Sequence, residues 1–167
     1  MSLSINSTLT LRLYYGAGNS ALTKKAARSE ATCGTLSFAD STALRTAIRR
    51  LKDYKWEEVD DKSAQERLMA FTDTVNATID SSSHYGTNDS SVKNALKEIK
   101  NLNKKHADEL KDIGITVKSD GTLSLSSSAA ENLSHSKFKE FFGNDSSYLN
   151  SLYSAAKKIN RKVDIRL

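Results

Sequence analysis

Residues able to bind a metal are few and scattered along the chain. The three histidines, His84, His106 and His135, occupy different segments, and none stands four residues from another or within an HExxH pattern. Cys33 is the only cysteine, which excludes an intrachain disulfide and a zinc site built from cysteine pairs. His106 lies near the apolar face of a predicted helix, where packing explains it better than metal coordination. We therefore expect neither a metal nor another cofactor.

Catalytic patterns are equally weak. There is no GxSxG motif, and no sequence signature of a catalytic thiol surrounds Cys33. The acidic pairs at 57–58 and 60–61 could be read as paired carboxylates, but neighbouring side chains point apart and favour a solvated acidic turn. The glycines at 16–18 supply only the GxG fragment of a nucleotide-binding GxGxxG. These observations predict a protein that is not an enzyme.

Composition and charge narrow the class of protein further. The chain has 167 residues, 38% of them hydrophobic and none of them proline, which allows one domain of uninterrupted helices. Its formal charge of +5 is a mild excess, without the dense basic patch of a nucleic-acid binder. The basic cluster at 157–162 stands where a helix macrodipole favours cations. The sequence therefore disfavours nucleic acid as a partner.

Targeting signals are not evident. No apolar run approaches the roughly 20 residues that cross a bilayer, so we expect no membrane span. The first 15 residues lack the basic and apolar regions of a cleavable secretory signal, while a non-cleaved export signal stays open.

The N-terminal residues form a separate segment in this interpretation. Apolar side chains alternate over residues 5–15, which predicts a strand. Those on one face are Leu9, Leu11, Leu13 and Tyr15. A glycine-containing hinge follows at 16–20. We expect residues 1–36 to be loosely attached to a helical domain that spans residues 37–167.

Helical periodicity dominates this second part of the chain. Each predicted helix begins with a capping residue ahead of an apolar stripe. The predicted starts are Asp40 or Ser41, Asp60 or Ser63, residues 88–91, residues 126–128, and Asp145 or Ser146. The sequence thus predicts a mostly α protein, an antiparallel bundle of about four to five helices.

The second and third of these helices have the pattern of a coiled-coil-like pair. The third runs without a break from about residue 88 to Leu110, and its apolar residues mostly recur at steps of three and four. The predicted seam consists of Leu68, Phe71, Val75 and Ile79 on one helix with Leu96, Ile99 and Leu102 on the other.

The stretch DIGITVKSDGTLSLS interrupts the helices with a predicted β-hairpin at residues 115–125. Gly114, beside Ile113, stands where a left-handed residue closes a helix. A three-residue loop at 119–121 with Gly121 left-handed puts all apolar strand residues on one face, whereas a two-residue loop sets them against polar partners. These apolar residues are Ile115, Val117, Leu123 and Leu125. A lone hairpin is marginal, so it must lie on helices or gain the N-terminal segment as a third strand.

Three short motifs occur in order along the second part of the chain. They are FTDTVN at 71–76, LKDIGIT with DGTLSL at 110–125, and FKEFFG at 138–143, which contains Phe141. In order and spacing they resemble the F-x-D-x-Y-N, L-x-x-I-G-I … D-G-x-L-x-L and V-x-x-L-F-G motifs of the bacterial flagellar filament cap protein, a hook-associated protein. Val75 stands where that family has tyrosine.

The resemblance implies a non-enzymatic structural or assembly protein that acts through protein–protein contacts. It implies type III export, an extracellular place at the flagellum, self-association, and contacts with flagellin or other flagellar components. The chain is shorter than the usual cap protein and has no room for its β-rich insert domains, and residues 1–60 match nothing in that family. The alternatives are a cytoplasmic partner-binding module such as an export chaperone, or a basic helical nucleic-acid-binding protein.

The last predicted helix carries a candidate partner surface. Aromatic side chains are enriched at protein interfaces, and this helix has two close together. The candidate residues are Tyr148, Leu149, Leu152 and Tyr153. The alternative is that they pack under the bundle.

Overall fold

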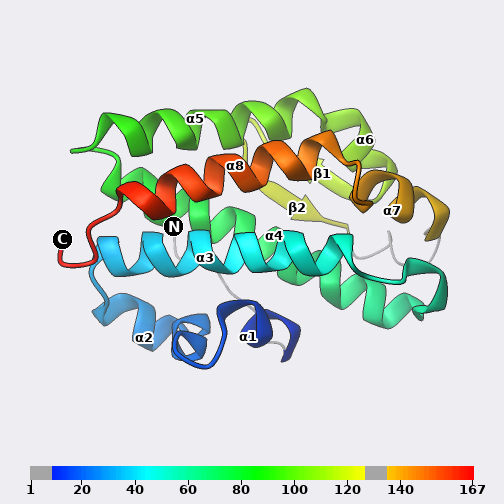
Figure 1. The fold of residues 1–167 in the computed structure, drawn as a ribbon, viewed down its shortest axis with the longest axis horizontal. Helices are drawn as coiled ribbons and strands as arrows, with labels where there is room; N and C mark the ends of the chain where they lie inside the picture. Colours follow the sequence, from blue (N-terminus) through cyan, green and yellow to red (C-terminus); the bar gives the residue numbers. More distant parts are fainter. Residues whose placement is uncertain (1–8, 127–134) are drawn as a thin grey trace.

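The computed structural model describes residues 9–126 and 135–167, which fold mostly into α-helices with one small hairpin (Figure 1). This confirms the predicted fold class. The α-helices are α1 (Leu9–Tyr15), α2 (Lys25–Glu30), α3 (Cys33–Lys52), α4 (Asp61–Tyr85), α5 (Ser90–Lys105), α6 (Ala107–Asp112), α7 (His135–Phe142) and α8 (Ser147–Lys162). Short 3-10 helices occur at η1 (Ser20–Thr23) and η2 (Trp56–Glu58), and the strands are β1 (Ile115–Val117) and β2 (Leu123–Leu125).

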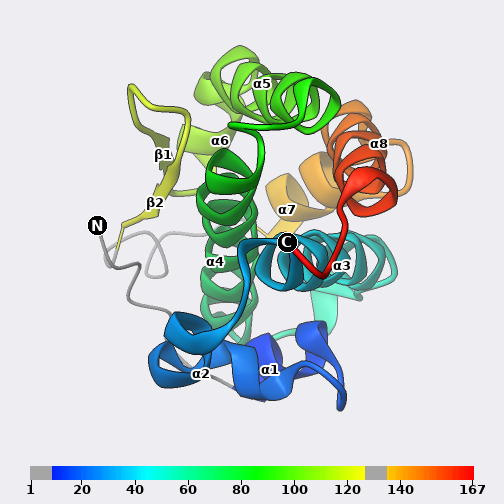
Figure 2. The ribbon, with the colours of Figure 1, turned by 90° about the vertical axis from the view of Figure 1, so that its left-hand side faces the viewer.

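The long helices α3, α5 and α8 run alongside one another, and α4 crosses them at an angle (Figure 1, Figure 2). The hairpin lies on one side of α4, and α1 and α2 lie on another side, where α1 packs against α3 and α4 and α2 packs against η1 (Figure 2). α8 packs against both α3 and α5. α4 packs chiefly on α3, so the predicted coiled-coil-like pairing of α4 with α5 is only a minor contact.

The N-terminal segment differs most from the sequence prediction. The predicted strand at 5–15 is wrong over its described residues, because Leu9–Tyr15 is helical; residues 1–8 lie outside the described part of the chain. The helix buries Leu11, Tyr14 and Tyr15, a spacing of three and four, in the same core as α3 and α4. The described helix α1 is therefore packed on the core and not loosely attached. Within the described residues the sheet has two strands, so the third strand is also wrong.

Helix boundaries follow capping chemistry, with two corrections. α3 begins at Cys33, where the Thr32 hydroxyl accepts from the Thr35 amide, so the predicted start at Asp40 or Ser41 is wrong. The long third helix breaks at His106 into α5 and α6. The caps at the starts of α4 and α8 are confirmed, since Asp60 and Ser146 each accept from the amide three residues later. The predicted cap at 126–128 lies largely outside the described residues.

The hairpin has the predicted register. Ile115 pairs with Leu125 and Val117 with Leu123, and the loop closes with the Gly121 amide donating to the Lys118 carbonyl at 2.9 Å. Gly114 and Gly121 both have φ of +87°, the left-handed conformation that glycine adopts without strain. Ile113, Ile115 and Leu123 are buried in the main core, while Val117 and Leu125 pack against it half-buried.

Aromatic rings fill the core at the junction of η2, α4 and α7. Trp56 stacks on Phe138 at 5.0 Å and on Phe142 at 5.7 Å, and Phe71 meets Phe142 edge-on at 5.6 Å. Val75, one turn further along α4, is also fully buried in the core. Sequence periodicity alone identified Phe71 and Val75 as core residues, and their burial is confirmed.

Candidate functional site

A buried asparagine ties the hairpin to α4. The Asn76 side-chain amide donates to the Leu123 carbonyl at 2.8 Å and accepts from the Leu123 amide at 2.8 Å. At Leu123 the backbone groups point away from β1, because the hydrogen-bonded pair of this ladder falls at Thr116 and Ser124. Asn76 therefore takes the place of a neighbouring strand and satisfies an otherwise open strand edge.

A second asparagine ties the hairpin loop to α5 and α8. The fully buried Asn103 donates to the Gly121 carbonyl at 2.8 Å and accepts from the Tyr148 hydroxyl at 2.8 Å. Burial raises the pKa of Tyr148 above its ordinary value, so the hydroxyl remains a donor at neutral pH. We call Asn76 and Asn103 the hairpin clamp. It makes the hairpin part of the helical core.

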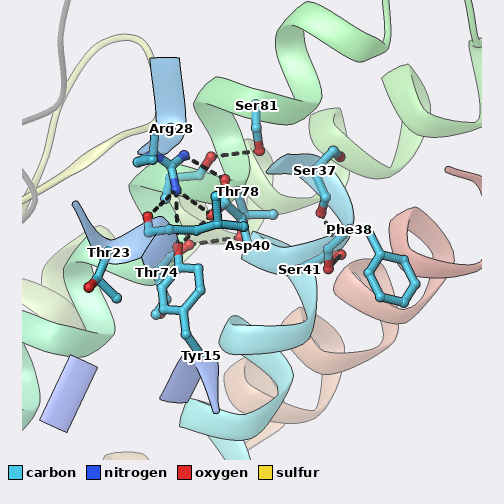
Figure 3. A network of polar contacts seen from close by, with 12 residues as sticks. Tyr15, Thr23, Arg28, Ser37, Phe38, Asp40, Ser41, Thr74, Thr78 and Ser81 are labelled. Carbon is cyan, nitrogen blue, oxygen red and sulfur yellow. Dashed lines mark hydrogen bonds and ion pairs between the residues drawn. The ribbon is translucent and has the colours of Figure 1, made fainter. Parts of the chain in front are cut away.

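A buried ion pair joins the N-terminal helices to α3. The Arg28 guanidinium donates to both carboxylate oxygens of Asp40, each at 2.8 Å. The Tyr15 hydroxyl donates to the same carboxylate, and Arg28 also donates to the Leu22 carbonyl at 3.2 Å. Four elements, α1, η1, α2 and α3, meet at this one pair, which we call the Arg28–Asp40 hub (Figure 3).

Burial controls the electrostatics of the hub. The Asp40 side chain is fully buried, and that of Arg28 is 12% exposed. Burial raises the pKa of Tyr15 well above its ordinary value, and the charge of Asp40 adds to the effect. Burial alone would lower the pKa of Arg28, but the hydrogen bonds and charge of Asp40 outweigh it and raise that pKa. The guanidinium stays charged and the phenol neutral at physiological pH.

Small hydroxyl side chains line the α3–α4 contact beside the hub (Figure 3). The Ser37 and Ser82 hydroxyls hydrogen bond to each other across the two helices at 2.9 Å. The Thr78 and Ser81 hydroxyls donate to carbonyls one turn earlier in α4, at 2.7 and 2.9 Å. Each of these buried groups thus has a partner, and the arrangement holds helices together instead of presenting a group to a substrate.

A cationic cleft of about 590 Å³ lies between α1, the end of α3 and the start of α4. We call it the arginine cleft. It is lined by Thr10, Leu13, Tyr14, Thr46, Arg49, Arg50, Leu51, Asp53, Tyr54 and Arg67. Neither Arg49 nor Arg50 forms an ion pair with any residue that the structure describes. With Asp53 as its one carboxylate among these residues, the cleft is net positive.

Aromatic packing positions the side chains of the arginine cleft. The Arg67 guanidinium lies 3.8 Å from the centre of the Tyr54 ring and donates to the Ser63 carbonyl at 3.1 Å. Tyr54 in turn meets the buried Trp56 edge-on at 5.1 Å. Arg67 is therefore held in place by the aromatic core, while Arg50 is exposed.

Tyr14 forms part of the cleft wall from α1. Tyr14 as a whole is only 3% exposed, and its hydroxyl makes no hydrogen bond with the described residues. Burial raises the pKa of Tyr14 to about 12, although the nearby charges of Arg67 and Arg50 act in the opposite direction. The phenol is therefore a neutral donor beside two cations.

Two other hollows have a different character. One of about 370 Å³ lies where α6, α7 and the start of α8 meet, with the rings of His106, Phe141 and Tyr148 and several carboxylates on its walls. There the His106 imidazole pairs with the Glu109 carboxylate on the next helix. The other, of about 560 Å³, is a groove between α5 and α8 lined mainly by polar side chains such as Asn101.

The predicted partner surface on α8 is mostly buried. Tyr148 is 1% exposed, and Leu149 and Leu152 are fully buried, so for these three the prediction of an accessible surface is wrong. Tyr153 is half-buried, with the Arg45 guanidinium 5.1 Å from its ring centre. These residues join α8 to α3 and α5, the alternative that the sequence had left open.

Sequence reasoning missed the hub, the hairpin clamp and the arginine cleft. Arg28 and Asp40 had no distinguishing pattern, and Asp40 was interpreted as a helix cap. Asn103 did carry a signal, because it is the one polar residue among the buried positions of α5, whereas the buried face of α4 around Asn76 also carries several threonines and serines. Cleft residues from α1 could not be assigned while that segment was predicted to be a strand.

Neither a candidate metal cluster nor a membrane-spanning helix is found in the described part of the chain. No group of three or more histidine, cysteine, aspartate or glutamate side chains there is arranged to hold a metal ion. None of the described helices combines the length and apolar character that crossing a bilayer requires.

Comparison with known proteins gives no relative. No protein-family model matches the chain. No curated protein and no solved structure matches it either.

Proposed function

We propose that this chain is a non-enzymatic structural or assembly protein of the flagellar filament-cap type, acting through protein–protein contacts. The observation that carries the proposal is the clamped hairpin. The motifs that resemble the cap family lie on α4, on α6 with the hairpin, and on α7, and the clamp and the aromatic core bring these elements into one packed unit.

The use of buried polar groups supports the same class of function. The hydrogen bonds of the Arg28–Asp40 hub join helices to one another, and those of the hairpin clamp join the hairpin to helices. Contacts with other molecules then fall to the surface, where α1 exposes Leu9 and Leu13, 68% and 51% accessible. Apolar side chains exposed close together on one helix are typical of a contact surface.

The experiment measures self-association and flagellin binding of the purified chain. Light scattering after gel filtration gives the oligomeric state, and co-sedimentation with flagellin filaments gives binding. Apolar protein contacts should persist between about 50 and 200 mM salt, whereas nucleic-acid binding falls steeply over that range. Detection of the chain in sheared filaments of the source cells tests the proposed extracellular place.

Two results would contradict the proposal. One is a chain that stays monomeric at every concentration and leaves flagellin in the supernatant. The other is binding to a DNA duplex that weakens steeply with salt, which would favour the nucleic-acid alternative.

A further inference from the structure

The arginine cleft has the features of a binding site. Its cations Arg49 and Arg50 have no carboxylate partner among the described residues, and Arg67 is fixed in place by the Tyr54 ring. Tyr14, a residue that is only 3% exposed, lines the same cleft, and its hydroxyl has no hydrogen-bond partner in the described residues. A free hydroxyl donor beside cations that have no carboxylate partner suits the binding of an anion.

We propose that the arginine cleft binds an acidic, amphipathic segment of a protein partner, with a glutamate or aspartate carboxylate between Tyr14, Arg50 and Arg67. The carboxylate would accept from the Tyr14 hydroxyl and from the guanidinium groups, in the fork geometry that arginine offers to carboxylates. This inference rests on the proposed function as a protein that works through protein contacts, and it names the chemistry of one partner surface.

The shape and the apolar border of the cleft favour a protein segment. Leu13 lines the cleft and is 51% exposed, and Leu9, one turn earlier on α1, is 68% exposed. A free inorganic anion would make no use of these leucines, whereas an amphipathic segment would cover them. The flat surface of a bilayer or a duplex backbone is poorly matched to a residue that is only 3% exposed, such as Tyr14.

The test uses two fluorescein-labelled helical peptides and the full chain. One peptide carries glutamate and leucine on one face, and its partner has every glutamate replaced by glutamine. Tyr14→Phe removes only the hydroxyl, and Arg50→Gln changes an exposed side chain. Arg161→Gln, exposed on α8 outside the cleft lining, is the matched control for charge.

The glutamate peptide should bind, and each cleft variant should weaken it about tenfold, the effect of one lost hydrogen bond to a charged group. Arg161→Gln should leave the affinity unchanged, and the glutamine peptide should bind at least tenfold more weakly than the glutamate peptide. Circular dichroism checks that each variant is folded. If Tyr14→Phe does not fold, the result for Arg50→Gln decides the test.

Three outcomes would overturn the inference. In the first, both peptides bind equally. In the second, Arg50→Gln and Arg161→Gln bind the glutamate peptide alike. In the third, phosphatidylserine vesicles, a DNA duplex or inorganic phosphate bind in a way that Arg50→Gln abolishes, while the glutamate peptide does not bind. Flagellin binding and self-association of Arg50→Gln are measured separately from peptide binding. If they persist while one of these three outcomes is found, the cleft inference is wrong and the proposed function stands.

Discussion

Removal of Arg28 from the buried hub should have one of the largest single-residue effects on the stability of this protein. The Arg28→Met variant keeps most of the side-chain volume but leaves the carboxylate of Asp40 without its cation. Asp40 is fully buried, so water cannot replace the guanidinium without opening the contact between α2 and α3. The Tyr15 hydroxyl remains as a hydrogen-bond donor, but it carries no compensating charge.

The expected magnitude follows from this burial. Breaking a buried ion pair by removing one partner costs about 3–5 kcal/mol, compared with about 0–1 kcal/mol for an exposed pair. For a chain of this length, each kcal/mol lowers the midpoint of thermal unfolding by about 2–4 °C. The Arg28→Met variant should therefore unfold roughly 10 °C below the parent.

The assay is urea unfolding followed by circular dichroism, with a double-mutant cycle. Asp40→Asn removes the charge but still accepts from Tyr15. The double variant should be less destabilised than the sum of the two single variants, by about 1–3 kcal/mol. Arg161→Met, which replaces an exposed arginine, is the control and should change stability by less than about 0.5 kcal/mol. A loss below about 1 kcal/mol for Arg28→Met, or strict additivity in the cycle, would refute the hub as a buried charged clamp.

Three further predictions concern the hairpin and the tyrosines. Asn76→Ala removes both hydrogen bonds to the Leu123 peptide groups, so the free energy of unfolding should fall by about 2 kcal/mol. The Leu123 amide should also exchange with solvent faster, which hydrogen exchange measures. Unchanged protection of this amide would contradict the clamp. Gly121→Ala should lower the free energy of unfolding in urea by about 1–2 kcal/mol, because Gly121 has φ of +87° and an added Cβ would lie 2.8 Å from the Lys100 side chain. An unchanged free energy of unfolding would contradict this geometry. Burial raises the pKa of Tyr14 from 10.0 to about 12, so its stabilisation is complete below pH 10 and is lost as pH rises through about 12, a change of roughly 3 kcal/mol. Unfolding at mildly and strongly alkaline pH should show a smaller loss for Tyr14→Phe than for the parent, and an equal loss would contradict the assignment.

The hairpin could be predicted because its determinants are local. Gly114 and Gly121 tolerate the left-handed conformation that the helix end and the three-residue loop require. The alternation of apolar residues on both strands then allows only one register that gathers them on one face. None of these arguments depends on the rest of the fold, and the structure has the predicted pairing.

The helix α1 could not be predicted for a related reason. Its seven residues are too few to form a stable helix alone, so the core of the folded protein decides their conformation. Leu9, Leu11 and Leu13 alternate as a strand would, but only Leu11 of these is buried, together with Tyr14 and Tyr15. The helical spacing of three and four was present in the sequence and was outweighed by the more regular alternation.

The hub was invisible to sequence reasoning because a buried ion pair has no period. Arg28 and Asp40 are 12 residues apart and lie on different helices, and nothing in either local sequence marks burial. An aspartate ahead of an apolar stripe is also the usual sign of a helix start, and this pattern misplaced the beginning of α3. Only the packing of α1 and α2 against α3 creates the site.

The hairpin clamp lies between the hairpin, which local sequence predicts, and the hub, which it does not. Part of the clamp could have been predicted from the sequence. A two-stranded hairpin leaves backbone donors and acceptors on its outer edges, and those that become buried need partners. Asn76 follows Val75 in the buried face of α4, and Asn103 follows the apolar Leu102 on α5. A predicted hairpin that must lie on helices, together with an amide beside Val75 on α4 and an amide on the apolar face of α5, predicts those amides as the missing partners. This also explains why the register is stable in so short a sheet: a shift by one residue would remove Leu123 from Asn76 and Gly121 from Asn103 at the same time.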